Sequence, residues 1–438
     1  MSHSPHLPAT PRRVFWIAVC LAATLAAGPA AAGDDVWITL GADAFASASR
    51  LFSSGAEGKP LPRLGEARGV VLTRVPRSGL DALSARLHED FRRCGGFIAH
   101  ESLEEARAEL ARVSSASLTV GGAGFTIDQP QWVQQVAGAV EEAQILNTMT
   151  ALSTGFANRY HAHASGTAAV NWIRDLWIGY AAGRPGVTVE LVTHPNTPQR
   201  SVVLNIPGTT LANEVVILGG HLDSIAPGTS NPNFSAPGAD DDASGIATIS
   251  EAARVLLASD FQPQRTLRII GYAAEEVGLR GSTHLAATYQ AAGVNVVAVL
   301  QQDLTDYQGS NEDVAFITDF TNANLTAFLV DLLETYQPEL TWTTTACGYA
   351  CSDHAPWHSR GYPAAFPVEA RFGEEIPWIH TTSDTVASLG NSAAHAVKFS
   401  RLAAAFLVET GRDGLPSNEL FYDGFETGND GAWSQTVP

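Results

Sequence analysis

Apolar residues in the middle of this chain form short, nearly continuous runs that are separated by stretches with helical spacing. The runs lie at 187–192, 200–206, 214–218, 267–274, 296–300 and 314–317, and helical patterns cover 132–152, 168–180 and about 243–257. Continuous apolar strands alternating with helices are typical of a parallel sheet buried on both sides. The pattern predicts an α/β domain over 125–413, with a mostly parallel sheet flanked by helices on both faces.

The preceding part of the chain has a different pattern. Strand-like runs at 36–40 and 69–72 are followed by helical spacing of Leu80, Leu83, Leu87 and Phe91, and by a second helical pattern over 103–113. A Gly-rich stretch at 121–124 ends this part. We predict a small α+β unit over 33–124 and interpret it as a propeptide that assists folding or covers the active site. A permanent accessory domain is the alternative.

Two dipeptides in this unit, His88-Glu89 and His100-Glu101, begin like the zinc-binding motif H-E-x-x-H. Arg92 and Glu104 stand where the second histidine of the motif belongs. Because one imidazole ligand is missing from each, neither dipeptide completes the motif. We therefore assign no catalytic residue to residues 33–124.

Both ends of the chain have their own composition. Arg12 and Arg13 precede an apolar stretch at 14–27 and small residues before Gly33, which is typical of a signal peptide. We predict a signal peptide over 1–32 and a secreted protein without a membrane anchor, since this stretch is too short for a comfortable span. Residues 414–438, rich in Pro, Ser, Asn, Asp and Gly, are predicted to form a C-terminal tail. The opening strand of a truncated β-sandwich is the alternative.

The net charge argues against one class of function, and the cysteine content predicts a disulfide bond. A net charge of −19 opposes nucleic-acid binding, which requires a basic surface, whereas 45% apolar and 16% charged residues indicate a globular protein. Cleavage of the signal peptide leaves Cys94, Cys347 and Cys351. An oxidising compartment favours a bridge between Cys347 and Cys351, and a zinc half-site is the alternative.

Candidate metal ligands share one position, at or just beyond the ends of apolar runs: His221, Asp241, Glu276, Asp303 and His380. Ligands of such sheets gather beyond the carboxyl ends of the strands. Carboxylates crowded there repel one another unless cations lie between them. The pattern predicts two divalent ions in a hydrolytic centre, with zinc favoured by the mixed imidazole and carboxylate donors and Co²⁺ or Mn²⁺ as substitutes.

Two further acids belong to this prediction. Glu275 is adjacent to Glu276, and neighbouring residues at a strand end point in different directions, so Glu275 is the candidate for proton transfer. Asp223 lies two residues after His221, where it can accept the second imidazole N–H.

Five segments, in consistent order, resemble the zinc aminopeptidases of peptidase family M28, in the bacterial leucyl aminopeptidase branch. They read GGHLDS (219–224), GADDDASG (238–245), AAEEVGLRGS (273–282), CGYACSDH (347–354) and IHTT (379–382). The resemblance covers about 129–411. It implies a zinc exopeptidase-like fold and two zinc ions per chain, bridged by Asp241. It pairs Glu276 with His380 on one ion and His221 with Asp303 on the other.

The resemblance also implies Glu275 as general base, a Cys347–Cys351 disulfide beside the substrate pocket and a cis peptide between Asp241 and Asp242. Tyr349 is a candidate donor to the oxyanion, with an ordinary packed tyrosine as the alternative. The implied pocket for the substrate side chain comprises Tyr349 and six apolar residues: Leu304, Ile317, Phe366, Val368, Phe372 and Ile379. Glu375 departs from the family, which carries an aromatic residue there, and a charge at the rim is expected to widen selectivity or to bias it toward basic side chains.

These residues lead to one functional expectation: a monomeric aminopeptidase that acts on peptide or protein N-termini, preferably with large apolar first residues. A carboxypeptidase, a glutaminyl cyclase on the same scaffold and a metal-free binding module are the alternatives. A serine hydrolase is disfavoured, because the chain has no G-x-S-x-G nucleophile motif.

Overall fold

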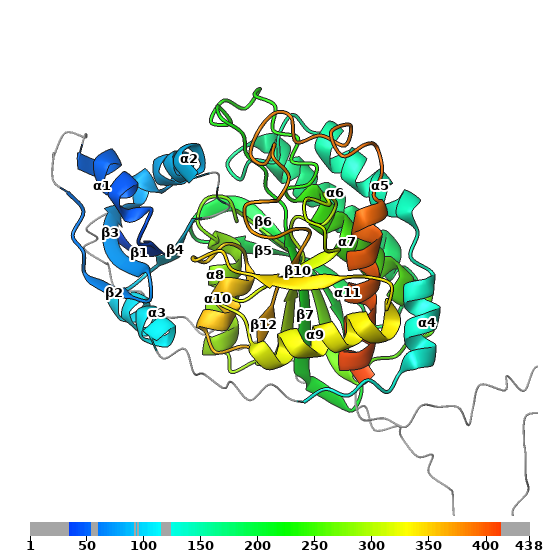
Figure 1. Cartoon of the computed structure of the whole chain (residues 1–438). Coiled ribbons are helices and arrows are strands. Elements are labelled where there is room, and N and C mark those ends of the chain that lie inside the picture. Colours follow the sequence, from blue (N-terminus) through cyan, green and yellow to red (C-terminus); the bar gives the residue numbers. More distant parts are fainter. Residues whose placement is uncertain (1–34, 54–59, 92, 94–95, 115–123, 413–438) are drawn as a thin grey trace, which may run out of the picture. The chain divides into compact units, whose positions relative to one another are not determined.

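The computed structural model describes residues 35–53, 60–91, 93, 96–114 and 124–412 (Figure 1). The predicted signal peptide, most of the Gly-rich stretch, Cys94 and the predicted tail at 414–438 lie outside the described residues. These features, and the removal of a propeptide, stay predictions.

The described residues between 35 and 114 form an antiparallel sheet in the order β2-β3-β1-β4. Val36, Ile38 and Leu40 alternate along β1 and share a core with Leu83 and Leu87 of α2, which explains the helical spacing in the sequence. The elements are β1 (Asp35–Gly41), α1 (Phe45–Ser53), β2 (Gly65–Ala67), β3 (Val70–Pro76), the 3-10 turn η1 (Arg77–Gly79), α2 (Leu80–Phe91), β4 (Phe97–His100) and α3 (Leu103–Ser114).

The main sheet has six strands in the order β12-β9-β7-β8-β6-β5 within the described residues. Neighbours from β12 to β8 run parallel, whereas β6 and β5 are antiparallel to their neighbours. A mostly parallel sheet is therefore confirmed. Its strands are β5 (Thr188–His194), β6 (Thr197–Ile206), β7 (Leu211–His221), β8 (Arg265–Tyr272), β9 (Asn295–Gln301) and β12 (Ala364–Ala365).

Helices cover both faces of this sheet (Figure 1). Val216 and Leu218 of β7 belong to the larger core, which α4, α5, α6, α7, α9 and α11 share, whereas Val215 and Ile217 share a second core with α8 and α10. Successive side chains of a strand point to opposite faces, so a strand covered on both sides is apolar throughout. The helices are α4 (Pro130–Gly138), α5 (Glu142–Thr154), α6 (Ala164–Ala181), α7 (Ala243–Ala258), α8 (Arg280–Ala291), α9 (Ala323–Tyr336), α10 (His354–Ser359) and α11 (Ala394–Arg412).

Two expectations from the sequence were wrong in detail. The run at 314–317 is a strand, β10 (Val314–Ile317), but it pairs with β11 (Trp342–Thr345) and β13 (Pro367–Val368) in a separate sheet. The short strand β12 pairs with β9 at the edge of the main sheet instead. The predicted helix at 132–152 is two helices, and Glu141 between them donates its backbone N–H to Glu251 at 2.7 Å.

None of the helices in the part of the chain that the structure describes has both the length and the apolar character that crossing a bilayer requires.

Candidate metal centre

The main sheet brings the predicted ligands to one edge. His221 is the last residue of β7, Glu275 and Glu276 follow β8 closely, and Asp303 follows β9. Because β9, β7 and β8 are parallel neighbours, their carboxyl ends meet at this edge. Asp241 lies just before α7, and His380 lies in the loop before α11.

The donor atoms form two groups that share Asp241. His221 Nε2 lies 3.0 Å from Asp241 Oδ1 and 3.6 Å from Asp303 Oδ1. On the other side, His380 Nε2 lies 2.9 Å from Asp241 Oδ2 and 3.3 Å from Glu276 Oε2. Ligands at ~2.0–2.1 Å from a tetrahedral zinc ion are separated by about 3.3 Å, which matches these distances.

The polar atoms of this edge fit a cation. His221 Nε2, Asp303 Oδ1, Glu276 Oε1 and His380 Nε2 are buried and make no hydrogen bond to any described residue. Buried polar atoms without partners are costly and rare, and buried carboxylates are usually paired or bound to metal. Each of these four residues belongs to a cluster whose donor atoms lie within 4.8 Å of one another. The residues present therefore suit divalent metal ions.

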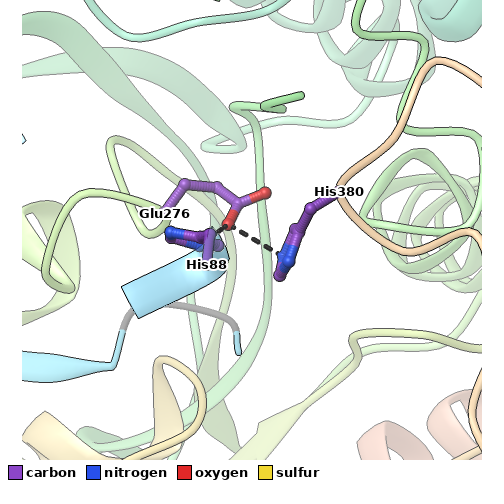
Figure 2. Close-up of side chains that lie close together, drawn as sticks. All are labelled: His88, Glu276 and His380. Carbon is purple, nitrogen blue, oxygen red and sulfur yellow. Dashed lines mark hydrogen bonds and ion pairs between the residues drawn. The ribbon is translucent and has the colours of Figure 1, made fainter. Parts of the chain in front are cut away.

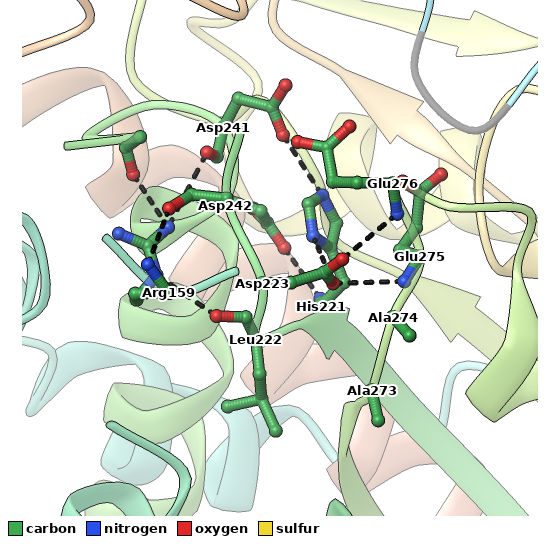
Figure 3. A network of polar contacts seen from close by, with 12 residues as sticks. Arg159, His221, Leu222, Asp223, Asp241, Asp242, Ala273, Ala274, Glu275 and Glu276 are labelled. Atoms are coloured by element: carbon green, nitrogen blue, oxygen red, sulfur yellow. Dashed lines mark hydrogen bonds and ion pairs between the residues drawn. The ribbon is translucent and has the colours of Figure 1, made fainter. Parts of the chain in front are cut away.

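Contacts distinguish the three consecutive aspartates at 240–242. Asp242 accepts from the backbone N–H of Gly245 and of His221, both at 2.8 Å, so it caps α7 and anchors the end of β7. Asp240 accepts from Asp306 N at 3.0 Å, and burial raises the pKa of Asp240 to about 6. Asp241, in contrast, directs one oxygen toward His221, as Figure 3 shows, and the other lies 2.9 Å from His380 Nε2.

Asp223 holds the two glutamates in place. Its carboxylate accepts from the backbone N–H groups of Glu275 and Glu276, at 2.9 and 3.2 Å (Figure 3). The distance from Asp223 Oδ1 to His221 Nδ1 is 3.5 Å, which is long for a hydrogen bond but short enough for strong electrostatic attraction. Asp223 therefore orients His221 at the end of β7 and the two glutamates in the loop after β8.

Glu275 is completely buried, and neither of its carboxylate oxygens makes a hydrogen bond to a described residue. Burial raises the pKa of Glu275 well above its usual value, and the adjacent Glu276 carboxylate raises it further. A divalent cation nearby acts in the opposite direction, because it favours the ionised carboxylate. A buried carboxylate without partners beside metal donors is suited to proton transfer.

Arg159 is a site residue that the sequence did not reveal. Its guanidinium is buried and donates to the backbone carbonyls of Leu222 at 3.0 Å, Pro237 at 2.5 Å and Gly238 at 2.9 Å. These carbonyls flank the segments that carry His221 and Asp241 (Figure 3). Arg159 lies in the connection between α5 and α6 and belongs to no motif, so only the tertiary contacts identify it.

Asp384 holds the same turn from the other side. Its carboxylate accepts from the backbone N–H groups of Asp240 at 2.9 Å and Asp241 at 3.1 Å. Asp384 lies more than 140 residues from Asp240 and Asp241 along the chain, so this contact depends on the tertiary structure. Together with Arg159, Asp384 fixes the position from which Asp241 reaches both histidines.

The model of a family described as "Peptidase family M28" matches residues 201–405. "Leucine aminopeptidase 1" of Penicillium rubens is 39% identical over 271 residues, which cover 58% of this chain and 68% of that protein. The protein of the same name from Grosmannia clavigera is 39% identical over 273 residues, 58% of this chain and 64% of that protein. The chain thus spans about two thirds of the length of the curated relatives it matches.

Among solved structures, the Legionella pneumophila LapA aminopeptidase superposes with a TM-score of 0.70 and 27% sequence identity. The superposition covers 86% of this chain and 99% of that one. The chain belongs to peptidase family M28. Within it, the chain groups with the metalloaminopeptidases, as the resemblance of its five segments indicated.

The M28 chain has an apolar cavity of about 250 Å³ beside the metal donors. Asp303 lines it, as do Glu375 and all residues that were predicted for the substrate pocket: Leu304, Ile317, Tyr349, Phe366, Val368, Phe372 and Ile379. Phe91, from the end of α2, also lines this cavity, which the sequence did not suggest.

Four features of the pocket wall and of the adjacent metal-binding turn bear on expectations from the sequence. The disulfide between Cys347 and Cys351 is present, and the peptide between Asp241 and Asp242 is cis. Tyr349 is buried in the wall and its ring packs edge-on against Phe372, with centroids 6.1 Å apart. Glu375 is half-buried at the cavity and accepts from Gly373 N at 2.7 Å, and burial raises the pKa of Glu375.

Proposed function

We propose that this M28 chain is a secreted, two-zinc aminopeptidase that removes large apolar residues from the N-termini of peptides. The carrying observation is the pair of buried donor groups, joined through the two oxygens of Asp241 and adjoining an apolar cavity of about 250 Å³. Action as a monomer, export and cleavage before Gly33 belong to the same proposal.

In this proposal, His221 and Asp303 would hold one ion, Glu276 and His380 would hold the other, and Asp241 would be shared between them. When bound, the two divalent ions supply Lewis acidity and lower the pKa of water. Asp223 and Arg159 keep the donor-bearing segments in register, and a misplacement of about 1 Å can lower turnover by roughly 100-fold.

Glu275 is the proposed proton carrier. Its carboxylate accepts a proton from the attacking water and delivers that proton to the leaving amine, so that its charge is restored after each turnover. Its burial excludes competing water, and Asp223 fixes its backbone through the 2.9 Å hydrogen bond. Tyr349 is the proposed hydrogen-bond donor to the developing oxyanion.

The walls of the cavity support the proposed preference for large apolar N-terminal residues. Leu304, Ile317 and Phe366 are buried apolar wall residues, so removing a leucine-like side chain from water in this cavity is favourable by roughly 1.5–3 kcal/mol. Glu375 adds a carboxylate at the same cavity. We expect leucine, methionine and phenylalanine to be cleaved fastest, with added tolerance for basic residues.

The test uses the purified chain, before and after proteolytic removal of the residues preceding the Gly-rich stretch. Elemental analysis should find about two zinc ions per chain, and Leu-nitroanilide hydrolysis should stop on chelation and return when zinc is added. N-acetyl-Leu-nitroanilide is the matched control, because an aminopeptidase requires a free α-amine. Equal hydrolysis of the acetylated substrate, or fastest cleavage of acidic residues, would contradict the proposal.

A further inference from the structure

Helix α2 carries His88 to the metal centre (Figure 2). The His88 Nε2 atom lies 3.2 Å from Glu276 Oε2, and its side chain is only 6% exposed. The His88 ring packs edge-on against the His380 ring, with centroids 4.4 Å apart. Donor atoms of His88, Glu276 and His380 lie within 4.8 Å of one another. A residue from the N-terminal unit therefore joins the donor group around Glu276.

Hydrogen bonds orient the His88 ring for ligation. Its Nδ1 lies 2.6 Å from the backbone carbonyl of Ser84, which can only accept, so Nδ1 carries the proton. In the neutral ring the lone pair of Nε2 then faces Glu276 Oε2, and two acceptors at 3.2 Å repel each other unless a cation lies nearby. An Nδ1–H bonded to a backbone carbonyl is the usual arrangement of a metal-bound histidine.

Contacts between the N-terminal unit and the catalytic domain hold α2 in this position. Ser84 donates its hydroxyl to the backbone carbonyl of Glu276, and Arg280 donates to Asp81 at 2.5 Å. Phe97 packs so closely against Gly278 that a Cβ atom at this position would clash with the Phe97 ring. These three contacts reach the loop from β8 to α8 and the first residue of α8, and the loop carries Glu275 and Glu276.

We propose that His88 supplies a fourth protein ligand to the ion held by Glu276, His380 and Asp241, and that this ligation keeps the full chain latent. The inference rests on the proposed function, since it requires that ion. A catalytic zinc ion keeps one open position beside three protein ligands, whereas a structural zinc ion has four protein ligands. His88 closes the open position, and removal of the N-terminal unit restores it.

The same helix also borders the substrate pocket. Phe91 lies one turn after His88 on α2 and lines the cavity of about 250 Å³. His88 and Phe91 lie on the same helix. Removal of the N-terminal unit would therefore free the metal position and remove part of the pocket wall in one step.

The test uses the full, uncut chain loaded with Co²⁺, whose visible absorption reports the number and type of ligands. His88→Phe retains an aromatic ring against His380 but removes the nitrogen donors. Glu89→Ala is the matched control, because Glu89 follows on the same helix and its side chain is 74% exposed. We expect a changed cobalt spectrum for His88→Phe and an unchanged spectrum for Glu89→Ala.

Two further measurements use the zinc-loaded chain. Transfer of zinc to a coloured chelator should be at least about tenfold faster from His88→Phe than from the unmodified chain, because one ligand is lost. Hydrolysis of Leu-nitroanilide by the uncut variant should rise by a similar factor or more.

An unchanged cobalt spectrum and an unchanged rate of zinc transfer in folded His88→Phe would overturn the inference and leave His88 as an ion-pair partner of Glu276 alone. Circular dichroism establishes folding, and His88→Gln, which keeps a donor toward Ser84, replaces the variant if it does not fold. Absence of any bound metal in the uncut chain would instead overturn the proposed function, and the inference with it.

Discussion

Replacement of Arg159 by methionine tests whether this residue holds the metal-binding segments together. Methionine fills a similar volume but leaves three close carbonyl acceptors, those of Leu222, Pro237 and Gly238, without their donor. A buried acceptor without a partner costs about 1–3 kcal/mol. Arg159 also lies near Asp241, Asp242, Asp223 and Asp384, whose charges favour its protonated form.

We therefore expect Arg159→Met to lower the free energy of unfolding by about 3–5 kcal/mol, a large part of the roughly 5–15 kcal/mol of a typical domain. Urea titration with chelator present removes the contribution of metal binding, and tryptophan fluorescence reports the buried Trp177. The denaturation midpoint should fall while the slope stays constant.

Arg174→Met is the matched control, because the Arg174 side chain is 32% exposed and its guanidinium pairs with Asp175 and Asn171 near the surface. It should change the free energy of unfolding by less than about 0.5 kcal/mol. A loss below about 1 kcal/mol in Arg159→Met would refute the reasoning, since it would mean that water or rearranged backbone satisfies the three carbonyls equally well.

Two further predictions concern carboxyl groups. Glu275→Gln should retain its zinc in elemental analysis while kcat falls by roughly 10²–10⁴-fold, because the amide cannot accept the proton, and near-normal turnover would exclude Glu275 as the base. Burial raises the pKa of Glu109 to about 7, so between its usual value of 4.5 and 7 the native state holds a proton that the unfolded chain has lost. Stability contributed by this group thus falls as the pH rises through that window and stays low above it. Glu109→Gln, which keeps an acceptor for Ser359, should unfold like the unmodified chain at pH 4 but be more stable by up to about 3 kcal/mol at pH 8. If urea titration gave the same stability difference between variant and unmodified chain at pH 4 and pH 8, the raised pKa of Glu109 would be contradicted.

Local sequence patterns were sufficient to predict the fold class and the sheet edge at which the candidate metal ligands lie. Apolar runs such as 214–218 and 296–300 are continuous because β7 and β9 are covered on both faces, and a polar residue that ends such a run must emerge at the sheet edge. His221 and Asp303 were predicted as ligands on this ground. The periodicity of α2 likewise predicted its buried face, because helix period and burial are both local properties of the chain.

Only the tertiary structure decided which group each polar residue meets. The resemblance singled out Asp241 among the three consecutive aspartates, but the separate contacts of Asp240, Asp241 and Asp242 depend on Asp306, His380 and the end of β7, which are distant along the chain. The pairing of β10 and the role of Arg159 depend equally on distant partners. His88 was dismissed because its motif is incomplete within α2, yet Glu276, 188 residues away, adjoins it in the fold. The period of apolar residues specifies which face of a helix or strand is buried. A hydrogen bond or a metal ligand requires a particular atom at one point in space, and the spacing of nearby residues does not determine that position.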